Sequence, residues 1–366
     1  MPGEWPSNPG PRDTASSDPS PARSTSRFFW VLVRLAIAAG LLAYLAKSGM
    51  IDLRALSRPF TAWPIALAAL ALILMDIALM ALKLSWLFRP RGLHVTWTKS
   101  FQLTLVGYFF AQFLPGSAGG DLAKLFYAAK DSRNRRSEII TVSLFDRAIG
   151  MFSLLLMPLL FAPIFYRLIA DTSALRFLLA TSAILAAILL AGFLACVFYQ
   201  SFVERVAQAL LGFLPWQHWR AQVIQTIASY RHNLGTVAAA LGLALLANSL
   251  SLIVIVLAVV ALNPARFDPK ICLIAPLGFV ANNLPFTPGG LGVGEASFNA
   301  LFAVAGLTGG AEVLLCWRVW TALVRLLGLA FYLRGIERVF HDRRPGNPAL
   351  PDEETLPRSP VGSIKN

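Results

Sequence analysis

Two stretches rich in glycine and proline each end in an acid, and both interrupt apolar sequence. The first elbow reads Phe113-Leu-Pro-Gly-Ser-Ala-Gly-Gly-Asp121, and the second reads Asn283-Leu-Pro-Phe-Thr-Pro-Gly-Gly-Leu-Gly-Val-Gly-Glu295. Glycines allow a phosphate to approach the backbone closely. The free N–H groups and positive dipole end of a following half-helix, near Leu122 and Ala296, attract anions. We therefore expect anion-binding positions at Gly116, Gly119, Gly120, Gly289, Gly290, Gly292 and Gly294.

The acids that close the elbows have two interpretations. Asp121 and Glu295 stand where the N-terminal cap of a half-helix belongs, and capping alone would account for them. Alternatively, each acid also carries a proton or binds an amine. The sequence leaves both interpretations open.

Charged residues inside apolar windows are a second signal. An Arg or Asp in the middle of a membrane helix costs roughly 2.5–3.5 kcal/mol, so such residues usually face a cavity or a partner. The candidates are Asp76, Asp146, Arg147, Arg318 and Arg325.

Their spacing suggests roles. Arg318 and Arg325 are seven residues apart and share one helical face. Arg147 and Arg325 could hold a lipid phosphate from two sides, since guanidinium groups bind phosphate in bidentate fashion. The alternative is that they snorkel to the interface or pair with the acids. Asp76 and Asp146 join Asp121 and Glu295 as candidate proton or amine partners.

Composition excludes a soluble protein. Hydrophobic residues make up 56% of the 366, and charged residues 14%, against roughly 25% in a typical soluble domain. The net charge of +13 indicates contact with anionic lipid at the cytoplasmic face rather than with nucleic acid, because the basic residues lie in short loops and at helix ends. The sequence predicts no metal site, no cofactor and no enzymatic nucleophile.

The chain reads as an all-α polytopic membrane protein. Apolar windows longer than the ~20 residues of a membrane helix predict full spans at about 28–46, 63–87, 138–166, 175–199, 235–262 and 312–334. The interrupted segments lie at about 100–129 and 271–306. Their first halves, 100–114 and 271–286, reach only about 22–24 Å at ~1.5 Å per residue, which is short of a ~30 Å bilayer core. Each is therefore expected to be a re-entrant hairpin.

The positive-inside rule places both termini in the cytoplasm. Arg12, Arg23 and Arg27 precede the first span, and Arg334 and Arg338 follow the last. Six spans plus two hairpins satisfy this, with the first hairpin opening from the cytoplasm and the second from the outside. Lys47, Arg54 and Arg58 oppose the assignment.

The order of span, span, hairpin and span occurs twice, which predicts an inverted repeat with halves of about 28–166 and 175–334. A weak echo supports it: Arg147-Ala-Ile-Gly150 follows the first elbow as Arg325-Leu-Leu-Gly328 follows the second. Coincidence between two glycine-rich loops is the alternative. We expect one membrane domain at 27–338 between disordered tails at 1–26 and 339–366.

The two elbows, together with the Asp146-Arg147-x-x-Gly150 helix, resemble the lysylphosphatidylglycerol synthase transmembrane-domain family. This is the membrane half of the bacterial multiple peptide resistance factor, also found as stand-alone inner-membrane proteins. The resemblance covers about residues 28–336. It implies a membrane part that flips aminoacylated phosphatidylglycerol outward in two-domain members. The soluble synthase domain is expected to be missing here, so lipid aminoacylation is not carried over.

The leading hypothesis is a non-enzymatic lipid translocase of the bacterial inner membrane, with a phospholipid headgroup in a cavity between the hairpins. A membrane partner that scaffolds a separate lipid- or glycan-modifying enzyme is the first alternative. A membrane-embedded transferase is the second. A second copy of the chain is a further candidate partner.

Overall fold

The computed structural model describes residues 62–93, 95–111, 136–199, 201, 205, 230–283, 287 and 290–334. Within these ranges every regular element is a helix, so the all-α prediction is confirmed. The first predicted span (28–46), both tails and the first elbow, with Gly116, Gly119, Gly120 and Asp121, lie outside the described residues. Gly289 of the second elbow does too.

Five helices in the described part of the chain are long and apolar enough to cross a membrane. They are α3 (Trp63–Phe88), α6 (Arg136–Phe161), α8 (Ser173–Phe198), α11 (Leu234–Leu262) and α14 (Gly310–Arg334). Each matches a span predicted from hydropathy. The shorter helices are α4 (Trp97–Ala111), α7 (Tyr166–Asp171), α12 (Ile271–Asn282) and α13 (Val293–Val304).

Proline and glycine set the helix ends. Pro64 occupies the first turn of α3, where its missing N–H is not needed. The Arg89–Arg91 turn after α3 ends on Gly92 in the left-handed conformation. The predicted span 138–166 was too long, because α6 ends at Phe161 and α7 starts separately at Tyr166. Pro163 falls in the turn between them, where its missing N–H and its ring disfavour continuation of the helix.

The second interrupted segment is a hairpin of two short helices, as predicted. α12 and α13 pack against each other, and each has 12 residues, about 18 Å at ~1.5 Å per residue. The break comes earlier than predicted, because α12 ends at Asn282 rather than at 286. The second half-helix starts at Val293 rather than near Ala296.

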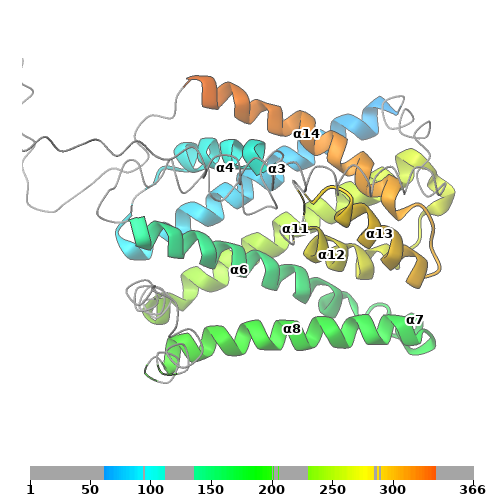
Figure 1. The fold of residues 1–366 in the computed structure, drawn as a ribbon, viewed down its shortest axis with the longest axis horizontal. Helices are drawn as coiled ribbons and strands as arrows, with labels where there is room; N and C mark the ends of the chain where they lie inside the picture. The colour runs from blue at the N-terminus through cyan, green and yellow to red at the C-terminus, as the bar shows by residue number, and fades with distance from the viewer. Residues whose placement is uncertain are drawn as a thin grey trace, which may run out of the picture.

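The packing of the helices is compatible with the two halves of the predicted inverted repeat. α11 crosses the middle of the bundle (Figure 1) and packs most extensively against α3. In the same way α4 packs against α14, and α12 packs against α6. If the halves are exchanged, so that α3 corresponds to α11, α4 to α12 and α6 to α14, the contact between α3 and α11 maps onto itself. The contact between α4 and α14 then maps onto the contact between α12 and α6. The opposite orientation of the halves in a membrane stays a prediction.

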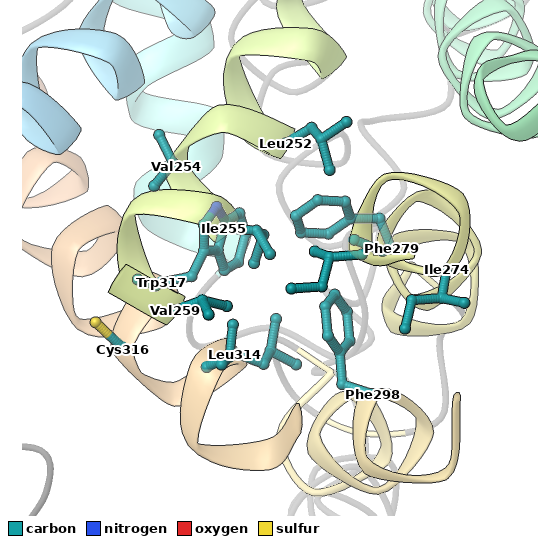
Figure 2. Packing of buried hydrophobic residues seen from close by; sticks show 14 of the residues in the cluster. Leu252, Val254, Ile255, Val259, Ile274, Phe279, Phe298, Leu314, Cys316 and Trp317 are labelled. Carbon is teal, nitrogen blue, oxygen red and sulfur yellow. The ribbon is translucent and has the colours of Figure 1, made fainter. Parts of the chain in front are cut away.

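An apolar core holds the hairpin to the rest of the bundle (Figure 2). Phe298 of α13 is fully buried and meets Phe279 of α12 edge-on, with ring centroids 5.5 Å apart. Phe279 in turn contacts Trp317 of α14 at 5.2 Å. Ile255 of α11 belongs to the same cluster. Burying a large apolar side chain is worth about 1.5–3 kcal/mol in water, while within lipid the close packing itself carries the stability.

α14 approaches α4 closely at Gly328, and this gives a prediction about stability. A Cβ at Gly328 would overlap the carbonyl oxygen of Leu105 and come within 3.0 Å of the Phe109 Cβ. Overpacking of this kind costs about 1–3 kcal/mol. Gly328→Ala should therefore lower the thermal unfolding midpoint of the detergent-purified protein, followed by tryptophan fluorescence.

Gly242→Ala is the matched control, since a Cβ there meets nothing within 4 Å. Alanine in a helix interior is favoured over glycine, so this variant should be as stable as the wild type or more so. Equal midpoints for Gly328→Ala and the wild type would contradict the close packing.

Candidate functional site

The charged residues predicted from sequence meet at one cavity of about 200 Å³. Its volume is several times the ~30 Å³ that a water molecule takes in the liquid. Three helices of each predicted half supply its wall: α3, α4 and α6 from the first, and α11, α12 and α14 from the second. The residues predicted from sequence that line it are Asp76, Asp146, Arg147, Arg318 and Arg325.

Arg318 holds the broken hairpin together. Its Nε pairs with Glu295 Oε1 at 2.5 Å. Its Nη2 donates to Asn282 Oδ1 at 2.6 Å and to the Gly290 carbonyl at 2.8 Å. One guanidinium of α14 therefore joins the end of α12, the turn and the start of α13.

Glu295 caps its own helix. Its Oε2 accepts the Gly292 N–H at 2.7 Å, and its side chain is fully buried. The carboxylate thus occupies the positive end of α13, where the sequence predicted an anion. Glu295 is not among the residues of the cavity wall. Its contacts are those of a helix cap, together with an ion pair to Arg318.

The glycines of the second elbow serve the turn. Gly290 and Gly292 have φ of +73° and +80°, a conformation that other residues rarely adopt. A Cβ at Gly294 would overlap Asn282 Oδ1 and come within 2.6 Å of Arg318 Nη2. None of the three is among the residues of the cavity wall. In the structure Gly290 lets Asn282 approach and Gly294 lets both Asn282 and Arg318 approach, and the predicted contact of the three glycines with substrate stays a prediction.

A second arginine binds the same elbow from the other side. Arg147 of α6 donates from Nη2 to the Asn283 carbonyl at 3.0 Å. That carbonyl lies just beyond the end of α12, where intrahelical partners run out. Arg147 and Arg318 therefore both satisfy backbone groups that the break in the hairpin exposes.

Asp146 pairs with Lys83, which the sequence reasoning missed. Lys83 Nζ lies 3.0 Å from Asp146 Oδ1 and donates to the Asp146 carbonyl at 3.2 Å. Lys83 is almost fully buried. The signal was present, since Lys83 is seven residues after Asp76 in an apolar window and shares its helical face.

Arg325 lies between two aromatic rings. Its Cζ is 5.2 Å from the Tyr108 ring centroid and 5.8 Å from that of Trp317. Aromatic faces attract a cation without satisfying its N–H donors. Among the described residues, Arg325 forms no ion pair or hydrogen bond with a carboxylate or carbonyl oxygen. No pattern in the sequence indicated that Tyr108 or Trp317 would lie at this site.

Polar side chains of α11 complete the wall. Asn248 donates from Nδ2 to Ser153 Oγ at 2.5 Å and lies 3.5 Å from the Gly150 carbonyl. Across the described part of the chain, no three His, Cys, Asp or Glu side chains gather closely enough to hold a metal ion. Cations are in the majority among the charged residues of the described cavity wall: Lys83, Arg147, Arg318 and Arg325 line it together with Asp76 and Asp146.

Comparison with known proteins agrees with the resemblance. The family model described as the lysylphosphatidylglycerol synthase TM region matches residues 31–328. The chain belongs to this family. It is a multi-pass membrane protein related to lipid modification or transport. No curated protein and no solved structure matched the chain.

The pair formed by Arg318 and Glu295 can be tested by a double-mutant cycle. Removing one partner of a buried pair typically costs about 3–5 kcal/mol, because it leaves an uncompensated charge. Glu295→Gln keeps an oxygen for the Gly292 N–H but loses the charge. We expect Glu295→Gln and Arg318→Met each to lower the free energy of unfolding strongly, and the double variant to cost less than the sum.

The measurement is denaturant unfolding in detergent, with Asp171→Asn as the control, since Asp171 is exposed at the end of α7. Effects that add to within about 0.5 kcal/mol would show that the two residues do not couple.

Proposed function

We propose that this protein is a lipid translocase of the bacterial inner membrane that passes a phospholipid headgroup through the cavity. The observation that carries the proposal is a charged cavity lined by membrane helices, with cations in the majority and one guanidinium, Arg325, that forms no hydrogen bond or ion pair with an oxygen of the described residues. The family, whose description names a lysylated phospholipid, supports a lipid substrate.

The size of the cavity supports a headgroup rather than a whole lipid. About 200 Å³ accommodates a phosphate with a small substituent, while two acyl chains need far more room. The outer surfaces of the long helices carry exposed apolar residues such as Phe177, Ile184 and Ile188 of α8. The chains would therefore stay in the bilayer while the headgroup crosses inside the protein.

Arg325 is the proposed phosphate ligand. A phosphate can accept two parallel hydrogen bonds from one guanidinium, and the rings of Tyr108 and Trp317 hold that guanidinium in place without using its donors. Arg147 lines the same cavity and would approach the phosphate from the other half. Asp121 at the first elbow stays a predicted amine or proton partner.

The second hairpin is the proposed moving part. Arg147 and Arg318 bind its elbow through Asn282, Asn283 and Gly290. A phosphate that attracts these two arginines would compete with those backbone and amide acceptors. Headgroup binding would in this way loosen the elbow. Because a ligand shifts an equilibrium toward the state that it binds more tightly, occupancy of the cavity would favour opening of the second hairpin.

The test is reconstitution into vesicles that contain phosphatidylethanolamine and phosphatidylglycerol. An impermeant amine reagent counts the exposed ethanolamine headgroups, and periodate counts the exposed glycerol headgroups. Wild-type protein should bring inner-leaflet lipid of at least one kind to the outside faster than empty vesicles do. Arg325→Gln should slow this roughly tenfold or more, since a hydrogen bond to a charged group is worth about 1.5–3 kcal/mol.

Arg176→Gln is the control, because Arg176 is exposed on α8 and away from the cavity. It should translocate at the wild-type rate. Vesicles in which neither lipid moves faster than in protein-free vesicles would overturn translocation and favour a scaffold for a separate enzyme.

A further inference from the structure

Asp76 has an unused acceptor at the cavity. It lies near the midpoint of α3 and lines the wall. Its Oδ1 is buried and has no hydrogen-bond partner among the described residues. A buried polar atom without a partner is costly, so this oxygen is a position where a ligand can contribute a hydrogen bond.

The other polar side chains around it already have partners. Asp146 pairs with Lys83 at 3.0 Å. Asn248 donates to Ser153 at 2.5 Å. Arg318 is bound to the second elbow. Asp76 therefore differs from its neighbours in offering an acceptor that no described residue uses.

Two cations act on the Asp76 carboxyl without forming an ion pair with it among the described residues. Arg325 and Lys83 are near enough to act on the Asp76 carboxyl electrostatically. Neither forms an ion pair with it within 4.0 Å among the described residues, because Lys83 is held by Asp146 and Arg325 lies between Tyr108 and Trp317. Among the described residues, the cavity thus presents a guanidinium and a carboxyl oxygen that have no hydrogen-bond partner and that act on each other electrostatically.

We propose that the headgroup taken by this cavity is zwitterionic, with a primary ammonium on Asp76 and a phosphodiester on Arg325. The inference rests on the proposed function and names its substrate class, a phosphoethanolamine-type lipid. A hydrogen bond from an ammonium to a carboxyl oxygen is charge-assisted and therefore stronger than a hydrogen bond from a neutral hydroxyl. A zwitterion also brings no net charge into a site of low dielectric, where an unpaired charge is expensive.

The experiment compares two short-chain lipids that differ at one group. Phosphatidylethanolamine and phosphatidylethanol share the phosphodiester and the two-carbon substituent, and only the first carries the ammonium. Binding to the full-length protein in detergent is measured by titration of tryptophan fluorescence. We expect the wild type to bind phosphatidylethanolamine at least roughly tenfold more tightly, as for a hydrogen bond to a charged group.

Asp76→Asn should reduce that preference to about twofold or less, while Asp171→Asn, the same change at an exposed site, should keep it. Equal binding of the two lipids by the wild type would overturn the proposal, and this comparison needs no variant to fold. A preference that survives in Asp76→Asn, shown to be folded by its circular dichroism, would also overturn it.

The binding readout separates this inference from the proposed function. Selective binding without movement of either lipid in vesicles would retain the zwitterionic site and reject translocation. Movement of phosphatidylglycerol as fast as phosphatidylethanolamine, with equal binding of the two short-chain lipids, would retain translocation and reject the site.

Discussion

The structure depends on one guanidinium at a break in the backbone. A membrane has no water to satisfy the N–H and C=O groups that a broken helix exposes, so a break is tolerated only where protein groups replace water. Arg318 donates to the backbone carbonyl of Gly290 and also binds the side chains of Glu295 and Asn282 on either side of the break. Without these contacts the turn between α12 and α13 would leave polar groups unpaired in an apolar surrounding. The two short helices could then not remain a hairpin inside the bundle.

The same requirement explains why the cavity is charged. The polar groups at the break in the hairpin need hydrogen-bond donors, and arginines supply these inside the bundle. Each buried guanidinium in turn needs an acid, a carbonyl oxygen or aromatic rings around it. Glu295 neutralises Arg318, the Asn283 carbonyl holds Arg147, and two aromatic rings hold Arg325. Groups that stabilise the fold and groups that are open to a ligand are therefore neighbours. Under the proposed function, a headgroup that competes for the stabilising contacts would loosen the hairpin.

The predicted halves contribute to this site in parallel but not identically. Arg147 on α6 and Arg325 on α14 lie downstream of the first and the second elbow, and both line the cavity. The long helices α3 and α11, which pack against each other, present Asp76 and Asn248. The amide of Asn248 is used within the protein, whereas Asp76 keeps an acceptor open among the described residues. The two predicted halves thus present different chemistry at the cavity, a carboxyl group from α3 and an amide from α11.

Hydropathy alone determined the membrane class, the five spans that the structure describes and the hairpin at the second elbow, because apolar length and broken helices are local properties of the chain. It also identified Asp76, Asp146, Arg147, Arg318 and Arg325, since a charge in an apolar window must face a cavity or a partner. Only the tertiary structure decided the pairings. Lys83 with Asp146, Arg318 with Glu295, and Arg325 with Tyr108 and Trp317 join residues on different helices. Their distances depend on how those helices cross, which no local pattern encodes.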